Sequence, residues 1–370
     1  MEPLSNLLYL LEPAAVLLMV TACTVVSLAA QRAYLHTRET ERHKDLQEQS
    51  ITLDSRQALL IPVASSCSLL VMFYLFSKVS GIITCITSVA AGASLVFCLA
   101  PLVSHLLTKV GLLDQTALRC PCGVLSRSQL LLSLLATTLV TLWLVTGHWL
   151  LNNALGTAIC VAFISHVRLP NVRICALLLG CLFVYDVFWV FFSEQFFGSN
   201  VMVAVATQQA HNPVRTVADS LNIPVSAAVT KKLDLPVKLV FPRDLFGGQT
   251  AAGAQPDCMM LGLGDMAIPG MLLALILSFD KRKERDEPRA GAPRHRYFRQ
   301  ASVGYAVGLV AALAAGVLTR SAQPALLYLV PSTLGPVLFS AWLRKEFWEM
   351  WDGPEGDPLE KDKERLLEAV

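Results

Sequence analysis

The chain has 370 residues, of which 54% are hydrophobic and only 16% are charged, and its mean hydropathy is +0.54. This composition excludes a soluble globular protein, because there are too few polar side chains to cover its surface. The net charge of +2 says little about binding partners. The sequence contains no nucleotide-binding fingerprint, and we expect no nucleic-acid partner. The sequence therefore predicts an integral membrane protein.

Uncharged apolar runs of about 20 residues, long enough to cross a bilayer as helices, occur nine times. Because the edges of such runs are uncertain by a few residues, counts of eight and ten stay open. We expect an all-α multi-pass membrane protein whose nine transmembrane helices lie near residues 13–30, 58–77, 82–102, 129–147, 149–167, 174–193, 258–279, 301–319 and 321–342.

Lysine and arginine are distributed unevenly over the connections between these runs. With a luminal N-terminus, 23 of the 30 cationic residues lie in cytosolic segments, as the positive-inside rule requires. Five of the other seven lie in residues 194–257, a connection long enough to be translocated regardless of charge. An odd number of spans then places the C-terminus in the cytosol. We expect an uncleaved first helix, since only Glu2 and Glu12 precede it and a signal peptide has a basic leader.

The spans and connections divide the chain into five parts. They are a first helix with a cytosolic loop (1–57), a bundle through the sixth helix (58–193), a luminal loop (194–257), three C-terminal helices (258–342) and a charged tail (343–370). We expect the tail to be disordered. Repeated Pro and Gly in the luminal loop predict one or two short strands, such as residues 237–241. This loop is a candidate gate or docking surface, with a plain linker as an equal alternative.

Two smaller features have plain interpretations. The basic cluster at residues 281–299 is expected to be a solvated cytosolic loop, with contact to anionic membrane lipid as the less favoured alternative. Cys120 and Cys122 form a C-P-C pair without a second pair or nearby histidines, so we expect no metal site there.

Two aspartates stand alone inside apolar runs: Asp186 within Ile174–Ser193 and Asp265 within Cys258–Phe279. Placing each in a bilayer costs roughly 2.5–3.5 kcal/mol on insertion scales, so a functional role is expected for both. Two carboxyls within a few ångström of each other can share one proton, and such a pair can activate water against a peptide carbonyl. We therefore predict a catalytic pair, whose protonated member the sequence does not identify.

The residues beside each aspartate suit this chemistry. The phenol of Tyr185 could donate a hydrogen bond to a carboxyl or to a substrate, although a packing role is the alternative. Gly262 and Gly264 let the backbone come close to a neighbouring helix or to a substrate. Taken alone, Asp265 could instead be the N-cap of the helix that follows.

A third feature is Gln323-Pro324-Ala325-Leu326 at the start of the last predicted helix, followed by Pro331. Pro324 removes a backbone donor and Pro331 should loosen the helix. Loosened backbone at membrane depth must line a polar cavity or meet other protein, and it could pair with an extended substrate. A kink that serves packing alone is the alternative.

These motifs resemble those of the GxGD intramembrane aspartyl proteases, the family of presenilin and signal peptide peptidase. The resemblance rests on Y-D in one helix, G-L-G-D opening the next and Q-P-A-L before the last. The chain is most similar to the type-3 signal peptide peptidase-like branch at TGHWLL (146–151), VRLP (167–170), YDVFWVFFS (185–193), KLVFP (238–242) and QPALLYLVP (323–331).

The resemblance implies an intramembrane aspartic endopeptidase that uses no cofactor and no metal. It makes Asp186 and Asp265 the catalytic pair, with site-shaping or substrate-binding roles for Tyr185, Gly262, Leu263, Gly264, Gln323, Pro324, Ala325 and Leu326. It further implies a luminal N-terminus, residence in the Golgi or endoplasmic reticulum, and type II membrane proteins as substrates, including Golgi glycosyltransferases that are shed. The oligomeric state, monomer or homodimer, stays open.

Two other functions stay open on the residues alone. A transporter or proton channel also uses intramembrane carboxylates, but it predicts internal repeats that the sequence lacks. A non-catalytic scaffold would tolerate loss of one aspartate. Zinc and serine intramembrane proteases are excluded, because neither H-E-x-x-H nor G-x-S-x-G occurs. Since hydrolysis needs water, we also predict a polar cavity between the sixth, seventh and ninth helices.

Overall fold

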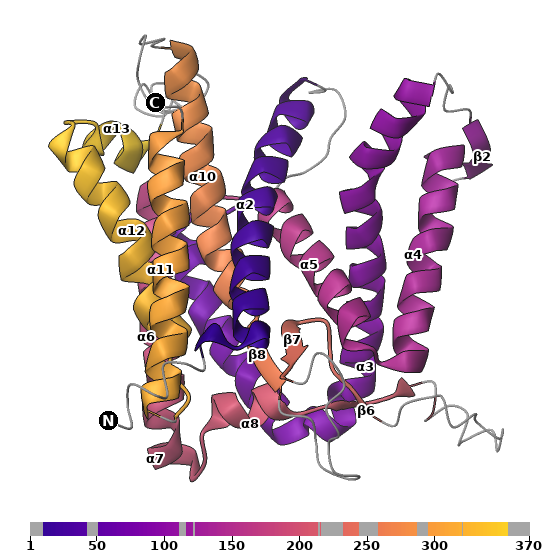
Figure 1. Cartoon of the computed structure of the whole chain (residues 1–370), viewed down its shortest axis with the longest axis horizontal. Coiled ribbons are helices and arrows are strands. Elements are labelled where there is room, and N and C mark those ends of the chain that lie inside the picture. The colour runs from indigo at the N-terminus through magenta and orange to yellow at the C-terminus, as the bar shows by residue number, and fades with distance from the viewer. Residues whose placement is uncertain are drawn as a thin grey trace, which may run out of the picture.

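The computed structural model describes residues 10–42, 51–110, 116–120, 123–213, 215, 232–243, 258–286, 295–319 and 321–353. The described helices form a bundle (Figure 1) and are α2 Pro13–Arg42, α3 Ser55–Val110, α4 Arg127–Thr146, α5 Trp149–His166, α6 Val172–Val187, α7 Ser193–Phe197, α8 Val201–Thr207, α10 Gly264–Asp286, α11 Arg296–Thr319, α12 Ala325–Leu343 and α13 Phe347–Asp352. A π-helical segment, η2 Phe188–Phe192, joins α6 to α7.

The strands among these residues are short and form two-stranded sheets. They are β1 Ile51–Thr52 with β4 Val167–Arg168 in parallel, and three antiparallel pairs, β2 Thr116–Cys120 with β3 Gly123–Ser126, β5 Ala210–His211 with β6 Lys232–Leu233, and β7 Lys238–Pro242 with β8 Cys258–Gly262. The strand expected at residues 237–241 is confirmed as β7.

Eight helical segments within the described residues are long and apolar enough to cross a membrane, and two of them lie within α3. The multi-pass helical fold is therefore confirmed, but the count of nine is not. The expected span that is not among these eight segments is α10. Every stretch of 18 residues in α10 contains at least three charged side chains, because Asp265 lies near its start and a charged run follows Phe279. This helix is therefore less apolar than the other spans.

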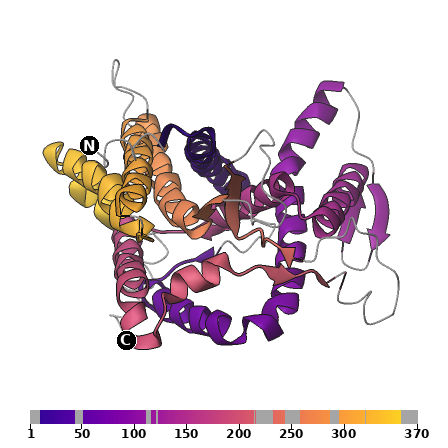
Figure 2. The same cartoon turned by 60° about the horizontal axis from the view of Figure 1, so that its bottom comes forward.

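The second and third expected helices are one continuous helix. We expected a break between residues 77 and 82, but α3 runs from Ser55 to Val110 and bends on its way through the bundle (Figure 2). A hydropathy minimum near Lys78 and Gly81 marks polar side chains, and it does not by itself interrupt backbone hydrogen bonding. The prediction of a loop there was wrong for this reason.

The helix expected from residue 258 begins six residues later. Cys258–Gly262 is strand β8, which pairs with β7, and α10 starts at Gly264. Glycine weakens a helix, whereas pairing with β7 satisfies the backbone groups of this apolar segment. The strand places Gly262 next to the start of the helix that carries Asp265.

The main hydrophobic core is built by α2, α5, α6, α10, α11 and α12. A smaller cluster joins α3, α4 and α5 through Ala91, Val140, Trp143 and Leu155. Many large apolar side chains of α3 and α4 are exposed, which fits contact with lipid. In Figure 1, α4 and the part of α3 beside it stand on the opposite side of the bundle from α11 and α12, whereas another part of α3 packs against α6.

Candidate functional site

Asp186 lies near the middle of the apolar segment Val172–Phe197, and its side chain is only 2% exposed. The segment starts at Asn171, whose side chain accepts a hydrogen bond of 3.0 Å from the N–H of Ile174 and so caps α6. The charged residue is therefore carried on a well-defined helix, as expected from its position in the apolar run.

Directly after Asp186 the helix widens into the π-helical segment η2. Its carbonyl groups find partners in polar side chains, because Ser193 Oγ donates to Trp189 O at 2.6 Å and Asn200 Nδ2 donates to Val190 O at 2.8 Å. The indole N–H of Trp189 donates to Ser66 Oγ on α3 at 3.1 Å. Such segments frequently occur at functional sites. Sequence reasoning missed this feature, and an isolated serine or asparagine near an apolar run would have been its only signal.

The motif that opens α12 meets Asp186 through its backbone. Pro324 is the N-cap of α12 and offers no side-chain hydrogen bond, and Leu326 lies in the first turn. The N–H of Leu326 donates to Asp186 Oδ2 at 2.9 Å. The carboxylate thus satisfies one of the unpaired amides of the helix start and lies at the positive end of the helix dipole.

Asp265 is the second residue of α10, and α10 packs against both α6 and α12. A Cβ atom built on Gly262 would lie 3.3 Å from Asp265 Oδ2, whereas one built on Gly264 would meet nothing within 4 Å. Of the two glycines, Gly262 is therefore the one whose small size leaves room for the carboxylate.

The β7–β8 sheet lies beside this carboxylate, and α5 covers one of its edges. Asn153 Nδ2 donates to Val240 O and Asn153 Oδ1 accepts from Val240 N, both at 2.8 Å. Asn152 Nδ2 donates to Lys238 O at 3.0 Å. The two amides occupy the outer edge of β7 as a third strand would, and sequence reasoning did not identify them.

The pairing register shows which way the backbone of β8 faces. Leu263 N–H donates to Val237 O at 3.1 Å, and Val240 gives its own backbone groups to Asn153. Since hydrogen-bonded and non-hydrogen-bonded pairs alternate in an antiparallel ladder, the backbone groups of Met260 and Gly262 face away from β7. The described part of the sheet thus has one covered edge, on β7, and presents the other edge on β8 next to Asp265.

Three predicted site residues have different surroundings from those expected. Gln323 bonds Thr319 and Ser321 through Nε2, and its Oε1 accepts from the Tyr328 hydroxyl, so it shapes the turn between α11 and α12. Tyr185 packs on the core and against the Trp189 ring, and within the described residues its phenol makes no hydrogen bond to either carboxyl.

Leu263, the third of these residues, is buried, and its carbonyl accepts from the N–H groups of Met266 and Ala267. This carbonyl makes the first hydrogen bonds of α10. Asp265 therefore lies inside the helix and is not its N-cap, which excludes that alternative. Ala325 opens α12 beside Pro324. Among the described residues, no group of three or more His, Cys, Asp or Glu side chains could hold a metal ion.

Comparison with known proteins shows the family of the chain. Residues 45–357 match the family described as signal peptide peptidase, peptidase A22B. The chain is 58% identical to a protein of Oryza sativa subsp. japonica named signal peptide peptidase-like 1, over the full length of both. It is 59% identical to the protein of the same name from Arabidopsis thaliana, over 98% of this chain and 99% of the relative.

The branch expected from the motifs is corrected by these similarities. A protein of Arabidopsis thaliana named signal peptide peptidase-like 3 is only 28% identical, over 85% of this chain and 53% of the relative. The chain is therefore closer to proteins named type 1 than to this one named type 3. Short motifs that many branches share could not separate the branches, whereas identity over the whole length does.

Proposed function

The chain belongs to the signal peptide peptidase family and is an intramembrane aspartic endopeptidase, and from this premise we propose that Asp186 and Asp265 are its catalytic pair. The observation that carries the proposal is the hydrogen bond from Leu326 N–H to Asp186 Oδ2. It joins the helix of one aspartate to the motif that opens α12, and α10, which carries the second aspartate, packs against both of these helices.

In the proposed reaction the two carboxyls share one proton. Asp186 holds the negative charge, because the N–H of Leu326 donates to it, and Asp265 holds the proton. Asp186 takes a proton from water as the water oxygen attacks the peptide carbonyl carbon, and Asp265 gives its proton to the carbonyl oxygen. When the tetrahedral intermediate collapses, the C–N bond breaks as the nitrogen takes the proton from Asp186 and one hydroxyl of the diol returns a proton to Asp265. An acid and an amine are released, and the pair again holds one proton. The water-filled cavity that this requires stays a prediction.

We propose that substrate adds to the sheet as a strand on β8. Asn152 and Asn153 already cover the β7 edge, so an extended peptide has the backbone groups of Met260 and Gly262 to pair with. Pairing there would place a scissile bond close to Asp265, because Gly262 adjoins its carboxylate. An unwound, extended substrate is also the form that a protease can hydrolyse.

The substrates are proposed to be type II membrane proteins of the Golgi or endoplasmic reticulum, with Golgi glycosyltransferases as one class. The support is the distribution of charge, with 23 of 30 cationic residues on the side proposed to be cytosolic. That orientation sets the N-terminus of this chain in the lumen. The relatives named signal peptide peptidase-like are compatible with this class but do not specify it.

The test follows cleavage of a type II reporter in membranes that carry either the native chain or a variant. Asp265→Ala and Asp186→Asn should each lower the cleavage rate by roughly 10²–10⁴-fold. The amide introduced by Asp186→Asn keeps the shape and can still accept the Leu326 hydrogen bond, so this variant should accumulate at the native level. Persistent cleavage by Asp265→Ala would refute the assignment. A reporter of the opposite orientation tests the substrate class separately, since it should stay intact.

A further inference from the structure

A cavity of about 360 Å³ lies at the end of the bundle opposite to the β7–β8 sheet. Its walls come from the C-terminal part of α2, the connection from α5 through β4 to α6, the C-terminal half of α10, and α13. These parts of the chain are far apart in sequence, and they meet on the side where the positive-inside pattern places the cytosol. The volume is near the lower end of the range of about 300–1,000 Å³ for small-molecule sites.

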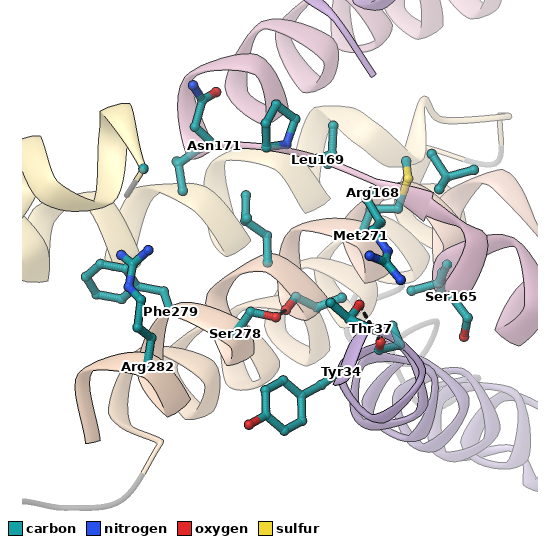
Figure 3. A pocket seen from close by; sticks show the side chains of 18 of the residues that line it. Tyr34, Thr37, Ser165, Arg168, Leu169, Asn171, Met271, Ser278, Phe279 and Arg282 are labelled. Atoms are coloured by element: carbon teal, nitrogen blue, oxygen red, sulfur yellow. Dashed lines mark hydrogen bonds between the residues drawn. The ribbon is translucent and has the colours of Figure 1, made fainter. Parts of the chain in front are cut away.

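Among the described residues that line this cavity, four are arginines and none is acidic. The arginines come from three elements: Arg38 from α2, Arg168 from β4, and Arg282 and Arg285 from α10. Figure 3 shows Arg168 and Arg282 on opposite sides of the pocket. Guanidinium groups in this arrangement suit a ligand that carries more than one negative charge, because each can bind phosphate oxygens in a bidentate manner.

Contacts within the protein hold two of these arginines in place. The backbone of Arg168 is fixed by the pairing of β4 with β1, in which Leu53 N–H donates to Arg168 O at 3.0 Å. The guanidinium of Arg282 lies over the ring of Phe279, 5.4 Å from its centroid. A preformed site loses less conformational entropy on binding than a flexible basic loop would.

Two neighbouring acidic side chains pair with a lysine of the same basic cluster. Lys283 pairs with Glu346 at 2.9 Å and with Glu349 at 3.2 Å. Burial alone would lower the pKa of Lys283, but the hydrogen bonds and charges of these two glutamates outweigh it and raise the pKa. The basic cluster after Phe279 thus includes Lys283, which these glutamates neutralise, and Arg282 and Arg285, which line the cavity.

The remaining walls favour an amphiphilic ligand over a simple ion. Apolar side chains of Ile164, Leu169, Met271 and Leu275 line the same cavity, together with polar groups such as Asn171. Figure 3 shows Met271 and Leu169 on the same side of the pocket as Arg168. A cavity with an arginine rim and an apolar wall, at the ends of membrane spans, matches a lipid whose charged headgroup lies at the membrane surface.

We propose that this cavity binds the headgroup of an anionic lipid of the cytosolic leaflet that carries more than one phosphate, of the phosphorylated inositol class. The bound headgroup would join α2, the α5–α6 connection and α10. Because α10 carries Asp265 at its other end, occupancy would tie the position of that helix to the lipid composition of the membrane. The binding does not depend on the proposed catalytic roles of the aspartates.

The test measures binding of the purified full-length chain to nanodiscs that contain either phosphatidylcholine alone or an added fraction of phosphorylated inositol lipid. The double variant Arg38→Gln with Arg282→Gln should weaken binding of the inositol lipid by about 100-fold, because it removes the charge-assisted hydrogen bonds that two guanidinium groups would make to the bound phosphates. The matched control is Arg173→Gln with Arg344→Gln, which removes the same charge from exposed positions that do not line the cavity. It should bind within about twofold of the native chain.

Equal losses in the two double variants would overturn the proposal, since they would indicate attraction to the surface charge alone. A soluble inositol phosphate that binds as tightly as the lipid would overturn the choice of a lipid source. Arg282→Lys keeps the charge but not the planar group, and we expect an intermediate loss. The melting temperature and elution volume of each variant show that it is folded, so failure to bind is attributed to the cavity. Cleavage of the type II reporter is measured separately and tests only the catalytic proposal.

Discussion

The spans of α3 and α4 and the spans around the aspartates have similar apolar sequences but are packed differently. In the 18-residue apolar stretch of Ser55–Phe76, no residue is buried within the protein. In the corresponding stretches of Lys78–Val110 and Arg127–Thr146, only 11% and 17% of the residues are buried. In the span that carries Asp186 the buried share is 44%, and in α5 it is 50%. Lipid can solvate the first group, whereas the second must fit against protein at close range. Substitutions should therefore have small effects on α3 and large ones near the site.

The largest contrast is expected between two glycines. A Cβ atom on Gly304 of α11 would clash with the backbone carbonyl oxygen of Ser332 on α12, whereas one on Gly81 of α3 would meet nothing within 4 Å. Gly304→Ala should push α12 away from α11 and displace the Leu326 N–H from Asp186. A shift of about 1 Å can cost roughly 100-fold in rate, so we expect a loss of that order in reporter cleavage.

Gly81→Ala is the matched control and should cleave at the native rate. Both variants are first compared for accumulation in the membrane, since overpacking also costs typically about 1–3 kcal/mol of stability. Native cleavage by Gly304→Ala would show that the α11–α12 contact is loose and that the contrast between the two regions is smaller than the packing indicates.

A smaller effect is expected within the G-L-G-D motif itself. Gly262→Ala introduces a methyl group 3.3 Å from Asp265 Oδ2, while Gly264→Ala has open space around it. Displacement of the carboxylate should lower the rate of cleavage by tens of fold, which is roughly 2 kcal/mol in the barrier. Gly264→Ala should retain most activity. The ratio of the two rates is the measured quantity, and a larger loss in Gly264→Ala would contradict the geometry described for the carboxylate.

The smallest of these effects is expected at the covered edge of β7. Asn153→Ala removes two hydrogen bonds to Val240 and leaves its backbone groups without them, and Asn152→Ala removes one bond to Lys238. An unsatisfied buried group costs about 1–3 kcal/mol, so Asn153→Ala should lower cleavage about tenfold and Asn152→Ala less. Thr138→Ala on exposed α4, where the hydroxyl only bonds its own helix, is the control. If all three variants cleave alike, the edge has no part in holding the sheet.

Particular segments show why some of the fold could be predicted and some could not. The span around Asp186 was found with nearly correct bounds, because a long apolar run has no other stable form in a bilayer. The start of α10 was not, since Cys258–Gly262 is apolar enough for a helix and becomes a strand only because β7 lies beside it. The same limit applies to α3, whose single continuous helix through Lys78 cannot be read from hydropathy.

The candidate site shows the same division. The cost of two charges in apolar runs identified Asp186 and Asp265, and the Q-P-A-L motif identified the segment that contacts Asp186. The contact itself is made by the backbone of Leu326, which no side-chain pattern reveals. Asn152, Asn153 and the π-helical turn after Asp186 were missed, because amides near a helix start and aromatic runs are common in membrane spans.

The sequence by itself determined that the chain crosses the membrane several times and that two acids lie within its apolar runs, since hydropathy and charge are properties of local composition. Only the tertiary structure decided which helix start reaches Asp186, which edge of the short sheet is covered, and that four arginines share one cavity. These are contacts between segments far apart in sequence, and they depend on how the helices pack in three dimensions.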